Sequence, residues 1–460
     1  MTQDMTKKPK RLTQDFTAGN ITKQMIVFAS PLFLSNLLQA VYNMVDMIIV
    51  GQEVGKAGLS AVSIGGDVLH FLTFLAMGFS SAGQVIIAQH IGAGKEERLD
   101  KIVGNLFTIL FSAAAVFSVL CFLLREPILQ IMNTPEESWD NALAYCSTCI
   151  LGMVFIYGYN VVSAIMRGMG DSRHPFVFIA IAALLNMVLD LVFVMGFGME
   201  AFGAALATVI SQGASFLFGL GFIIRHRGEM NLHLSRRSFA LDRSVVGDLM
   251  KLGIPMAIKS AAISVSMLFV NSWVNSYGVV PSGTAGVFHK LNTVSNLFCN
   301  ATNAACSTMI GQNIGGEKYK RVPRILYTGY AINLSLVAVL ALLLVLFPNA
   351  IFGIFTDDAE ILEASSRLVP VLLLAFFASA IRSPSSGLID GSGNYKLNFA
   401  VAFLDGMLNR IGFSLLFGLA FDMGWIGFLY GDAVAGLTPF FIGYIYFLTG
   451  KWKTRKYLIR

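Results

Sequence analysis

Residues 89–98 read QHIGAGKEER and residues 312–321 read QNIGGEKYKR, so that five residues recur at an offset of 223 positions, from Gln89 to Gln312. The same offset relates three residues further along to their copies: Gly168, Gly170 and Asn186 recur as Gly391, Gly393 and Asn409. One offset that holds across separate segments indicates that the two halves of the chain are copies of one unit. Duplicated hydrophobic halves are typical of transporters with a site between their repeats.

The composition indicates that the chain lies in a membrane. Of its 460 residues, 55% are hydrophobic and 13% charged, and the mean hydropathy is +0.68, whereas soluble domains carry roughly 25% charged residues. A helix needs about 20 apolar residues to cross a bilayer. Stretches of that length begin near Gln24, Leu59, Ile102, Asn141, Pro175, Phe202, Asp248, Thr284, Arg324, Arg367, Leu397 and Gly424. The sequence therefore predicts an all-α polytopic membrane protein with twelve transmembrane helices, six per half.

The distribution of Lys and Arg predicts the orientation, because these residues accumulate in cytoplasmic loops. They gather in the N-terminal segment, in the even-numbered connections and in the C-terminal tail, whereas the opposite side carries only Lys56, Arg125 and Arg367. Both termini are therefore expected in the cytoplasm. Since six is an even number, the halves enter the membrane in the same orientation. Two six-helix bundles related by a pseudo-two-fold axis along the membrane normal follow from this.

The same pattern predicts the domain bounds. Residues 1–23 form a polar N-terminal segment without the apolar core of a cleavable signal peptide. Residues 24–224 form the first lobe, residues 225–247 a basic cytoplasmic linker that acts as a hinge, residues 248–449 the second lobe, and residues 450–460 a cytoplasmic tail.

Motifs for catalysis, metal binding or a cofactor are missing from the sequence. There is no phosphate-binding loop, no H-E-x-x-H and no G-x-S-x-G, and the Cys146-x-x-Cys149 pair is interpreted as helix packing. Gly168-Met169-Gly170-Asp171 matches the G-x-G-D of intramembrane aspartyl proteases, but its copy at residues 391–394 lacks the second acid which that chemistry needs. We interpret both copies as helix-ending turns, and we expect neither enzymatic activity nor a bound cofactor.

Ionisable groups inside the spans are functional candidates, because a charge in hydrocarbon is costly. The first half carries Asp46, Asp67 and Asp190, and Asn186 shares a helical face with Asp190 because the two are four residues apart. Thr208 lies at a similar depth. These oxygen donors predict a binding site for a coupling ion, either H⁺ or Na⁺. Ordinary hydrogen bonding between helices is the alternative for Asn186 and Thr208.

The second half carries charges of the opposite sign. Lys259, Lys290, Arg382 and Arg410 stand against one clear acid, Asp405. Arg382 and Asp405 lie at similar depth and are candidates to neutralise each other, whereas Lys259 and Arg410 have no evident partner in their own half. A cavity with one acidic and one basic wall follows, which suits a substrate with a negative group or with both signs. Charge pairing across the two halves is the alternative.

The chain resembles the multidrug and toxic compound extrusion (MATE) family over its whole length, and its acidic first half resembles the DinF-like prokaryotic branch. The motifs that carry the resemblance are Ala29-Ser30-Pro31, the stretch from Tyr42 to Gly51 (YNMVDMIIVG), Gln89-His90-Ile91-Gly92, Arg167-Gly168-Met169-Gly170-Asp171 and Asn186-Met187-Val188-Leu189-Asp190.

The resemblance implies a secondary antiporter that exports organic compounds across the prokaryotic plasma membrane in exchange for H⁺ or Na⁺. It implies that Asp46, Asp190, Asn186 and Thr208 form the coupling-ion site and that Pro31 marks a bend in the first helix. The chain departs from the NorM-like branch because it has no glutamate near Lys259, which argues against a cation site in the second half.

The expected partners are a small organic substrate and the lipid bilayer, with no nucleic acid, and the protein is expected to act as a monomer. Tyr42, Tyr145 and Asn160 join Asp67 and the charged residues of the second half as candidates to line the substrate cavity; Tyr145 is also a candidate interfacial anchor. Three other classes stay open: a flippase for a lipid-linked oligosaccharide or another anionic or zwitterionic amphiphile, an intramembrane enzyme, and a passive channel.

Overall fold

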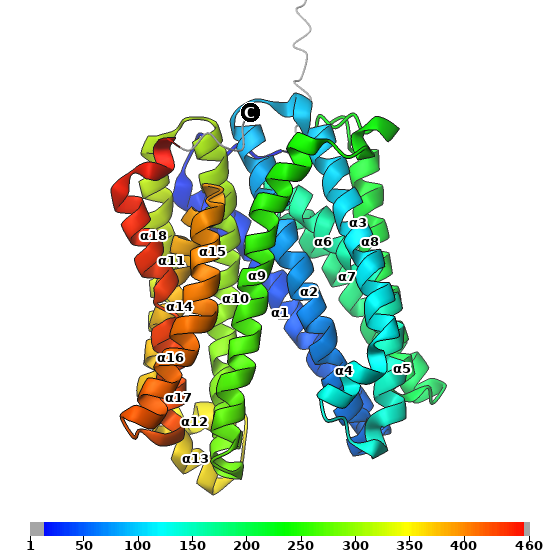
Figure 1. Ribbon diagram of the computed structural model, residues 1–460, viewed down its shortest axis with the longest axis vertical. Coiled ribbons are helices and arrows are strands. Elements are labelled where there is room, and N and C mark those ends of the chain that lie inside the picture. The colour runs from blue at the N-terminus through cyan, green and yellow to red at the C-terminus, as the bar shows by residue number, and fades with distance from the viewer. Residues whose placement is uncertain (1–12, 455–460) are drawn as a thin grey trace, which may run out of the picture. The chain divides into compact units, whose positions relative to one another are not determined.

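The computed structural model describes residues 13–454, and the elements in this part of the chain are all helical (Figure 1). The basic residues predicted for the cytoplasmic termini lie partly outside it: Lys7, Lys8, Lys10, Arg11, Arg455, Lys456 and Arg460 fall outside the described residues. The chain forms two compact units. The first contains the described residues up to Phe16 and residues Leu34–Met250, and the second contains Thr17–Phe33 and the chain from Lys251 onward.

The first unit is built from helices that pack around α2 and α8. In chain order they are α1 (Ile21–Glu53, from Leu34 onward), α2 (Gly55–Gly92), α3 (Leu99–Leu123), α4 (Arg125–Ile131), α5 (Trp139–Leu151), α6 (Met153–Gly168), α7 (Arg173–Asp190), the π-helix η3 (Leu191–Gly196) and α8 (Glu200–Arg225). Helix α7 packs along α8, and α2 packs against α5 and α6.

The second unit repeats this order. It contains α9 (Arg243–Asn275), α10 (Val279–Gly315), α11 (Val322–Leu346), α12 (Pro348–Gly353), α13 (Ala359–Ser366), α14 (Val369–Gly391), α15 (Tyr395–Phe403), the π-helix η6 (Leu404–Asn409), α16 (Arg410–Leu415), the π-helix η7 (Leu416–Ala420), α17 (Gly424–Ala435) and α18 (Thr438–Thr449). Its apolar core gathers Phe288, Phe352, Phe376 and Phe428, with the Trp273 ring stacked on Phe428.

Most of the twelve predicted spans appear as helices long and apolar enough to cross a membrane. Among the described residues, ten helices meet that requirement, and α5 with α6 make an eleventh if that pair, bent by 47°, is one span. The remaining predicted span corresponds to α10, which has 37 residues but carries many polar side chains, among them His289 and Lys290. Large apolar side chains such as Leu123 and Ile131 are more than two-thirds exposed, as expected for surfaces that face lipid. The membrane fold class is confirmed.

Each unit begins its repeat with a helix of 33 residues that contains a proline, Pro31 in α1 and Pro255 in α9. Proline cannot donate a backbone hydrogen bond and favours a bend. In α1 the boundary between the two units falls between Phe33 and Leu34, directly after Pro31. The helix is thus divided between the units at the position where proline weakens its backbone ladder.

The linker predicted at residues 225–247 packs on α3 of the first unit. The Asn105 Nδ2 donates to the carbonyl oxygens of Ser238 (3.3 Å) and Ala240 (3.1 Å), and its Oδ1 accepts from the Asp242 backbone N–H (2.9 Å). Lys101 Nζ lies 3.0 Å from Asp242 Oδ2. One side chain thus satisfies three backbone groups of the linker, and an ion pair closes its end.

Gly104 explains how closely the linker approaches α3. A Cβ atom built on this glycine would lie 2.1 Å from the carbonyl oxygen of Ser238, far inside van der Waals contact. The backbone of the linker therefore rests directly on the backbone of the helix.

We expect Asn105→Ala to loosen the linker. Three hydrogen bonds are lost and buried backbone groups remain unsatisfied, and each such loss costs about 1 kcal/mol or more, so amide exchange in residues 236–242 should accelerate roughly tenfold or more. Hydrogen–deuterium exchange measures this directly. Ser118→Ala on the same helix, which removes a bond to the Ile150 carbonyl, is the control and should leave linker exchange unchanged, and equal exchange in all three proteins would contradict the assignment.

The Lys101–Asp242 contact predicts a pH dependence. The hydrogen bond from Lys101 holds the pKa of Asp242 below its ordinary value, which is about 3.9. A lowered pKa means that the contact stabilises the docked linker above the ordinary pKa, and that this stabilisation disappears as the pH falls through the lowered pKa. The difference in linker exchange between the wild-type protein and Lys101→Met should therefore be present at pH 6 and vanish below about pH 3. A difference that grows on acidification would contradict this sign.

Candidate functional site

The acidic residues predicted for the first half meet inside the first unit. Asp46 on α1 is 7% exposed, Asn186 on α7 is 2% exposed and Asp190 at the end of α7 is fully buried. Asn186 and Asp190 are one helical turn apart, directly before the π-helix η3. Asp46 and Asp190 lie close enough to interact electrostatically. Two carboxylates and an amide from α1 and α7 thus share one buried region.

These polar groups lack internal partners. Within residues 13–454, neither Oδ1 of Asp46, nor either Asp190 carboxylate oxygen, nor either amide atom of Asn186 forms a hydrogen bond. Buried polar atoms are normally paired, and unpaired ones carry a large desolvation cost. A cluster of unpaired buried oxygen atoms is therefore suited to hold a proton or a hard cation, which would supply the missing interactions.

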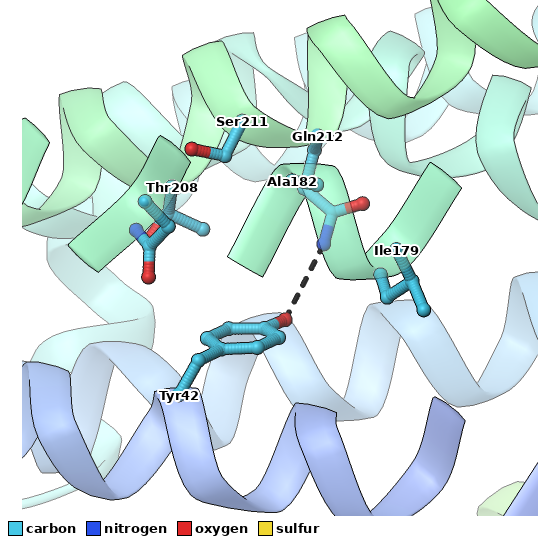
Figure 2. Close-up of a pocket in the computed structure, with 7 residues that line it drawn as sticks. Tyr42, Ile179, Ala182, Thr208, Ser211 and Gln212 are labelled. Carbon is cyan, nitrogen blue, oxygen red and sulfur yellow. Dashed lines mark hydrogen bonds between the residues drawn. The ribbon is translucent and has the colours of Figure 1, made fainter. Parts of the chain in front are cut away.

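A small cavity adjoins this cluster (Figure 2). Its volume is about 10 Å³, which is room for about one water molecule. Figure 2 shows the Gln212 side chain pointing toward the Tyr42 hydroxyl, to which Gln212 Nε2 donates at 3.4 Å. The residues that line the cavity are Tyr42, Ile179, Ala182, Asn186, Thr208, Ser211 and Gln212.

The cavity thus brings Asn186 and Thr208 together with Tyr42. The sequence analysis did not single out Ser211 and Gln212, although they lie three and four residues beyond Thr208 and so share its helical face. Gln212 and Ser211 are both buried polar residues, and that spacing was the available signal.

The other residues predicted to line a cavity in the first unit have varied surroundings. Tyr145 is buried and interacts electrostatically with Asp46, and it packs so tightly on Gly65 that a Cβ there would lie 2.4 Å from its ring. Asn160 is buried, but its Nδ2 donates to the Ile156 carbonyl of its own helix at 2.9 Å. Asp67 is exposed on α2. Tyr145 therefore adjoins the acidic cluster, whereas the Asn160 amide makes a local bond.

The second unit pairs the cations that were expected to lack partners. Lys259 Nζ lies 2.9 Å from Asp390 Oδ1 and 2.9 Å from Asn398 Oδ1. Arg410 forms ion pairs with Asp405, at 3.1 Å, and with Asp432. The expectation that Lys259 and Arg410 have no partner in their own half is therefore wrong.

The proposed pairing of Arg382 with Asp405 is wrong as well. Arg382 donates to Asn296 Oδ1 at 2.9 Å, whereas Asp405 is held by Arg410. Lys290 is exposed, and its Nζ lies 5.8 Å from the centre of the Phe355 ring.

Two acids were missed because of where they lie along their helices. Asp390 is the penultimate residue of α14 and Asp432 follows Gly431 in α17, and both are at least 94% buried. Only Asp405 had been counted as an acid of this half. The signal available for Asp390 was its position beside the repeated Gly391.

The turns with the G-x-G-D pattern are helix caps, as interpreted from the sequence. Gly170 has a φ of +86°, and Asp171 Oδ1 accepts from the backbone N–H groups of Arg173 and His174 at 3.0 and 3.2 Å. In the second copy, Asn394 Oδ1 accepts from the Leu397 N–H at 3.2 Å. Each acid or amide thus starts the helix that follows.

Two repeated helical units with a buried, unpaired acidic cluster in one of them define a polytopic membrane transporter. The model of the MatE family matches residues 31–192 and again residues 255–416. The chain therefore belongs to the MatE family, a family of transporters, and its two matches confirm the internal repeat.

Curated relatives span nearly the same length. The chain is 27% identical to the probable multidrug resistance protein YpnP of Bacillus subtilis over 443 residues, which covers 96% of this chain and 98% of YpnP. It is 26% identical to the probable multidrug resistance protein NorM of Thermotoga maritima, with 96% of this chain and 95% of NorM covered.

Solved structures share the fold. A transporter of the MOP superfamily from Pyrococcus furiosus, whose binding pocket is described as having reverse polarity, superposes with a TM-score of 0.86 at 21% identity and covers 97% of this chain and 100% of that chain. A MATE structure in a bent conformation gives a TM-score of 0.84 at 22% identity, with 95% and 97% covered.

We expect the Lys259–Asp390 pair to contribute to folding as a unit. Lys259→Met leaves the Asp390 carboxylate buried without its cation, which costs about 3 kcal/mol, and should lower the thermal unfolding midpoint of the purified protein. The double variant Lys259→Met with Asp390→Leu removes both charges and should recover most of the loss. Asp357→Asn, at an exposed acid, is the control. Additive losses in the double variant would show that the pair has no mutual stabilisation.

Proposed function

We propose that this protein is a secondary active antiporter that exports organic compounds in exchange for H⁺ or Na⁺ by alternating access. The observation that carries the proposal is the buried cluster of Asp46, Asn186 and Asp190, whose oxygen atoms lack hydrogen-bond partners in the described part of the chain. The two carboxylates require a proton or a cation to remain buried. Exchange of that ion supplies the energy for transport.

The family supports the class of cargo. YpnP and NorM carry multidrug resistance in their names, as does export in the name of MepA of Staphylococcus aureus, with which this chain is 21% identical over 398 residues. We extend multidrug export to this chain on that basis. The charge distribution of the loops places the protein in the prokaryotic plasma membrane with both termini in the cytoplasm.

The coupling step follows from the position of Asp46 on α1. This helix carries both the acid and Pro31, and it is divided between the two units directly after the proline. An ion on Asp46 cancels its repulsion with Asp190 and lets α1 pack against α7, whereas its loss restores two unpaired charges. The bend at Pro31 gives the helix a place to change shape between those two states.

The residues at the cavity suit an ion or a hydrogen-bonding group more than a second acid. Tyr42 and Gln212 hydrogen-bond to each other, and Gln39 also donates to the Tyr42 hydroxyl at 3.4 Å. Thr208 and Ser211 add hydroxyl groups. Neutral oxygen donors around two carboxylates complete the kind of ligand set that Na⁺ or a shared proton requires.

The flippase alternative loses much of its support. It was favoured by the unpaired cations of the second half, but Lys259 and Arg410 are each paired with carboxylates there. A paired cation attracts an anionic headgroup less than a free one does. The pairing also removes two of the reasons to disfavour an organic cation as substrate.

We expect Asp46→Asn and Asp190→Asn each to abolish ion-driven uptake of fluorescent organic compounds into proteoliposomes. Asparagine preserves the shape of the side chain and removes its charge, so the variants should fold normally and fail to couple. The assay applies opposing Na⁺ and pH gradients to cationic, zwitterionic and anionic compounds.

Asp140→Asn is the matched control, because Asp140 is an exposed acid at the start of α5, and it should transport like the wild-type protein. Undiminished uptake by both cluster variants would overturn the proposal. Transport of a lipid-linked oligosaccharide with no response to either gradient would favour the flippase.

A further inference from the structure

The repeat between the units changes its register by one residue. Gly55 and Gly278, and Gly170 and Gly393, have positive φ angles at an offset of 223 residues. Further along, Gly198 and Asp422, and Glu200 and Gly424, have positive φ angles at an offset of 224 residues. One residue has therefore been added between Gly393 and Asp422 relative to the first unit.

The added residue is explained by the π-helix η6, Leu404–Asn409. A π-helical turn is wider than an α-helical turn and inserts an additional residue. The first unit has a single π-helix at the corresponding span, η3, and its counterpart in the second unit is η7, Leu416–Ala420. η6 has no counterpart among the elements of the first unit.

The corrected register changes which residues correspond. After η6 the counterpart of Asn186 is Arg410 and not Asn409, and the counterparts of Asp190 and Thr208 are Ser414 and Asp432. The contacts support this register independently. Asn186 and Thr208 line one cavity in the first unit, and Arg410 and Asp432 form an ion pair in the second.

The first helix of each repeat gives the remaining counterpart. Pro31 and Pro255 are 224 residues apart, which aligns Asp46 with Val270, a fully apolar residue that is 1% exposed. The second unit thus lacks both acids of the cluster in the first. Arg410 and Asp432 stand where the first unit has an amide and a hydroxyl.

The surroundings of Arg410 resemble those of a bound cation. The residue is 3% exposed, and two acids from different elements, Asp405 of η6 and Asp432 of α17, contact its guanidinium. His289 of α10 interacts electrostatically with both Arg410 and Asp432, and its Nε2 lies 2.6 Å from Asn271 Oδ1 of α9. An arginine guanidinium stays protonated in proteins, so this positive charge does not leave the site.

We propose that Arg410 is a tethered cation that occupies, in the second unit, the place that the coupling ion takes in the first. The second unit then contains a cation site, formed by Asp405 and Asp432, that the guanidinium keeps filled. The exchangeable ion is bound by the first unit alone. The inference rests on the proposed function for the identity of the exchangeable ion, but the occupancy of the second site by Arg410 can be tested separately.

The test counts ions on the purified full-length protein, with radiolabelled Na⁺ in equilibrium binding and a pH indicator for proton uptake. Arg410→Met has a similar volume without the charge and should bind at least one additional Na⁺ or H⁺ per protein. The additional ion should persist when Asp46→Asn is introduced as well. Arg410→Lys restores a tethered cation and should bind no more than the wild-type protein.

Two outcomes would overturn the inference. A folded Arg410→Met that binds no additional ion would show that the acids do not form a cation site. Loss of an ion in Asp432→Asn, in an otherwise unchanged chain, would show that the second unit binds an exchangeable ion despite Arg410, and this variant decides the matter if Arg410→Met does not fold. Failure of the proposed function gives a different result, since Asp46→Asn would then bind as many ions as the wild-type protein.

Discussion

The cost of a buried charge organises this molecule more than any other interaction. Water is absent from the bilayer core, so that each charged side chain in a span must find its partner within the protein or in an ion that the protein binds. The second unit takes the first course, with Lys259 held by Asp390 and Arg410 held by Asp405 and Asp432. The first unit takes the second course, since Asp46 and Asp190 meet without any cation between them in the described residues. The difference in function between the halves follows from this difference in charge balance.

Backbone irregularities decide where these charges lie. Proline divides α1 and bends its counterpart α9, and π-helices interrupt the equivalent spans that carry Asp190 and Arg410. Each irregularity changes the direction or the register of the residues beyond it. A helix that was regular throughout would place Asn409 where the second unit has Arg410, and an amide there could not neutralise Asp405 and Asp432.

The sequence predicted those features that depend on periodicity. The positions of the spans follow from runs of apolar residues, and the shared face of Asn186 and Asp190 follows from their spacing of four residues. The partners in the second unit could not be predicted, because pairing was judged from depth along ideal helices. Asp390 lies at the end of α14, and yet the long side chain of Lys259 reaches it. Likewise the extra residue of η6 is invisible in a simple offset, and it hid the correspondence of Arg410 with Asn186.

An antiporter needs at least one site whose charge is satisfied only when an ion is bound, because only such a site responds to the ion gradient. A second site of that kind would double the charge moved in each cycle and would require the second unit to change with the first. An internal guanidinium removes that requirement, since its charge is the same in every state of the cycle. The second unit can then keep one packing while α1, with Asp46 and Pro31, responds to the ion. The asymmetry of the charges thereby assigns the moving part to the first unit, although both units are built from the same repeat.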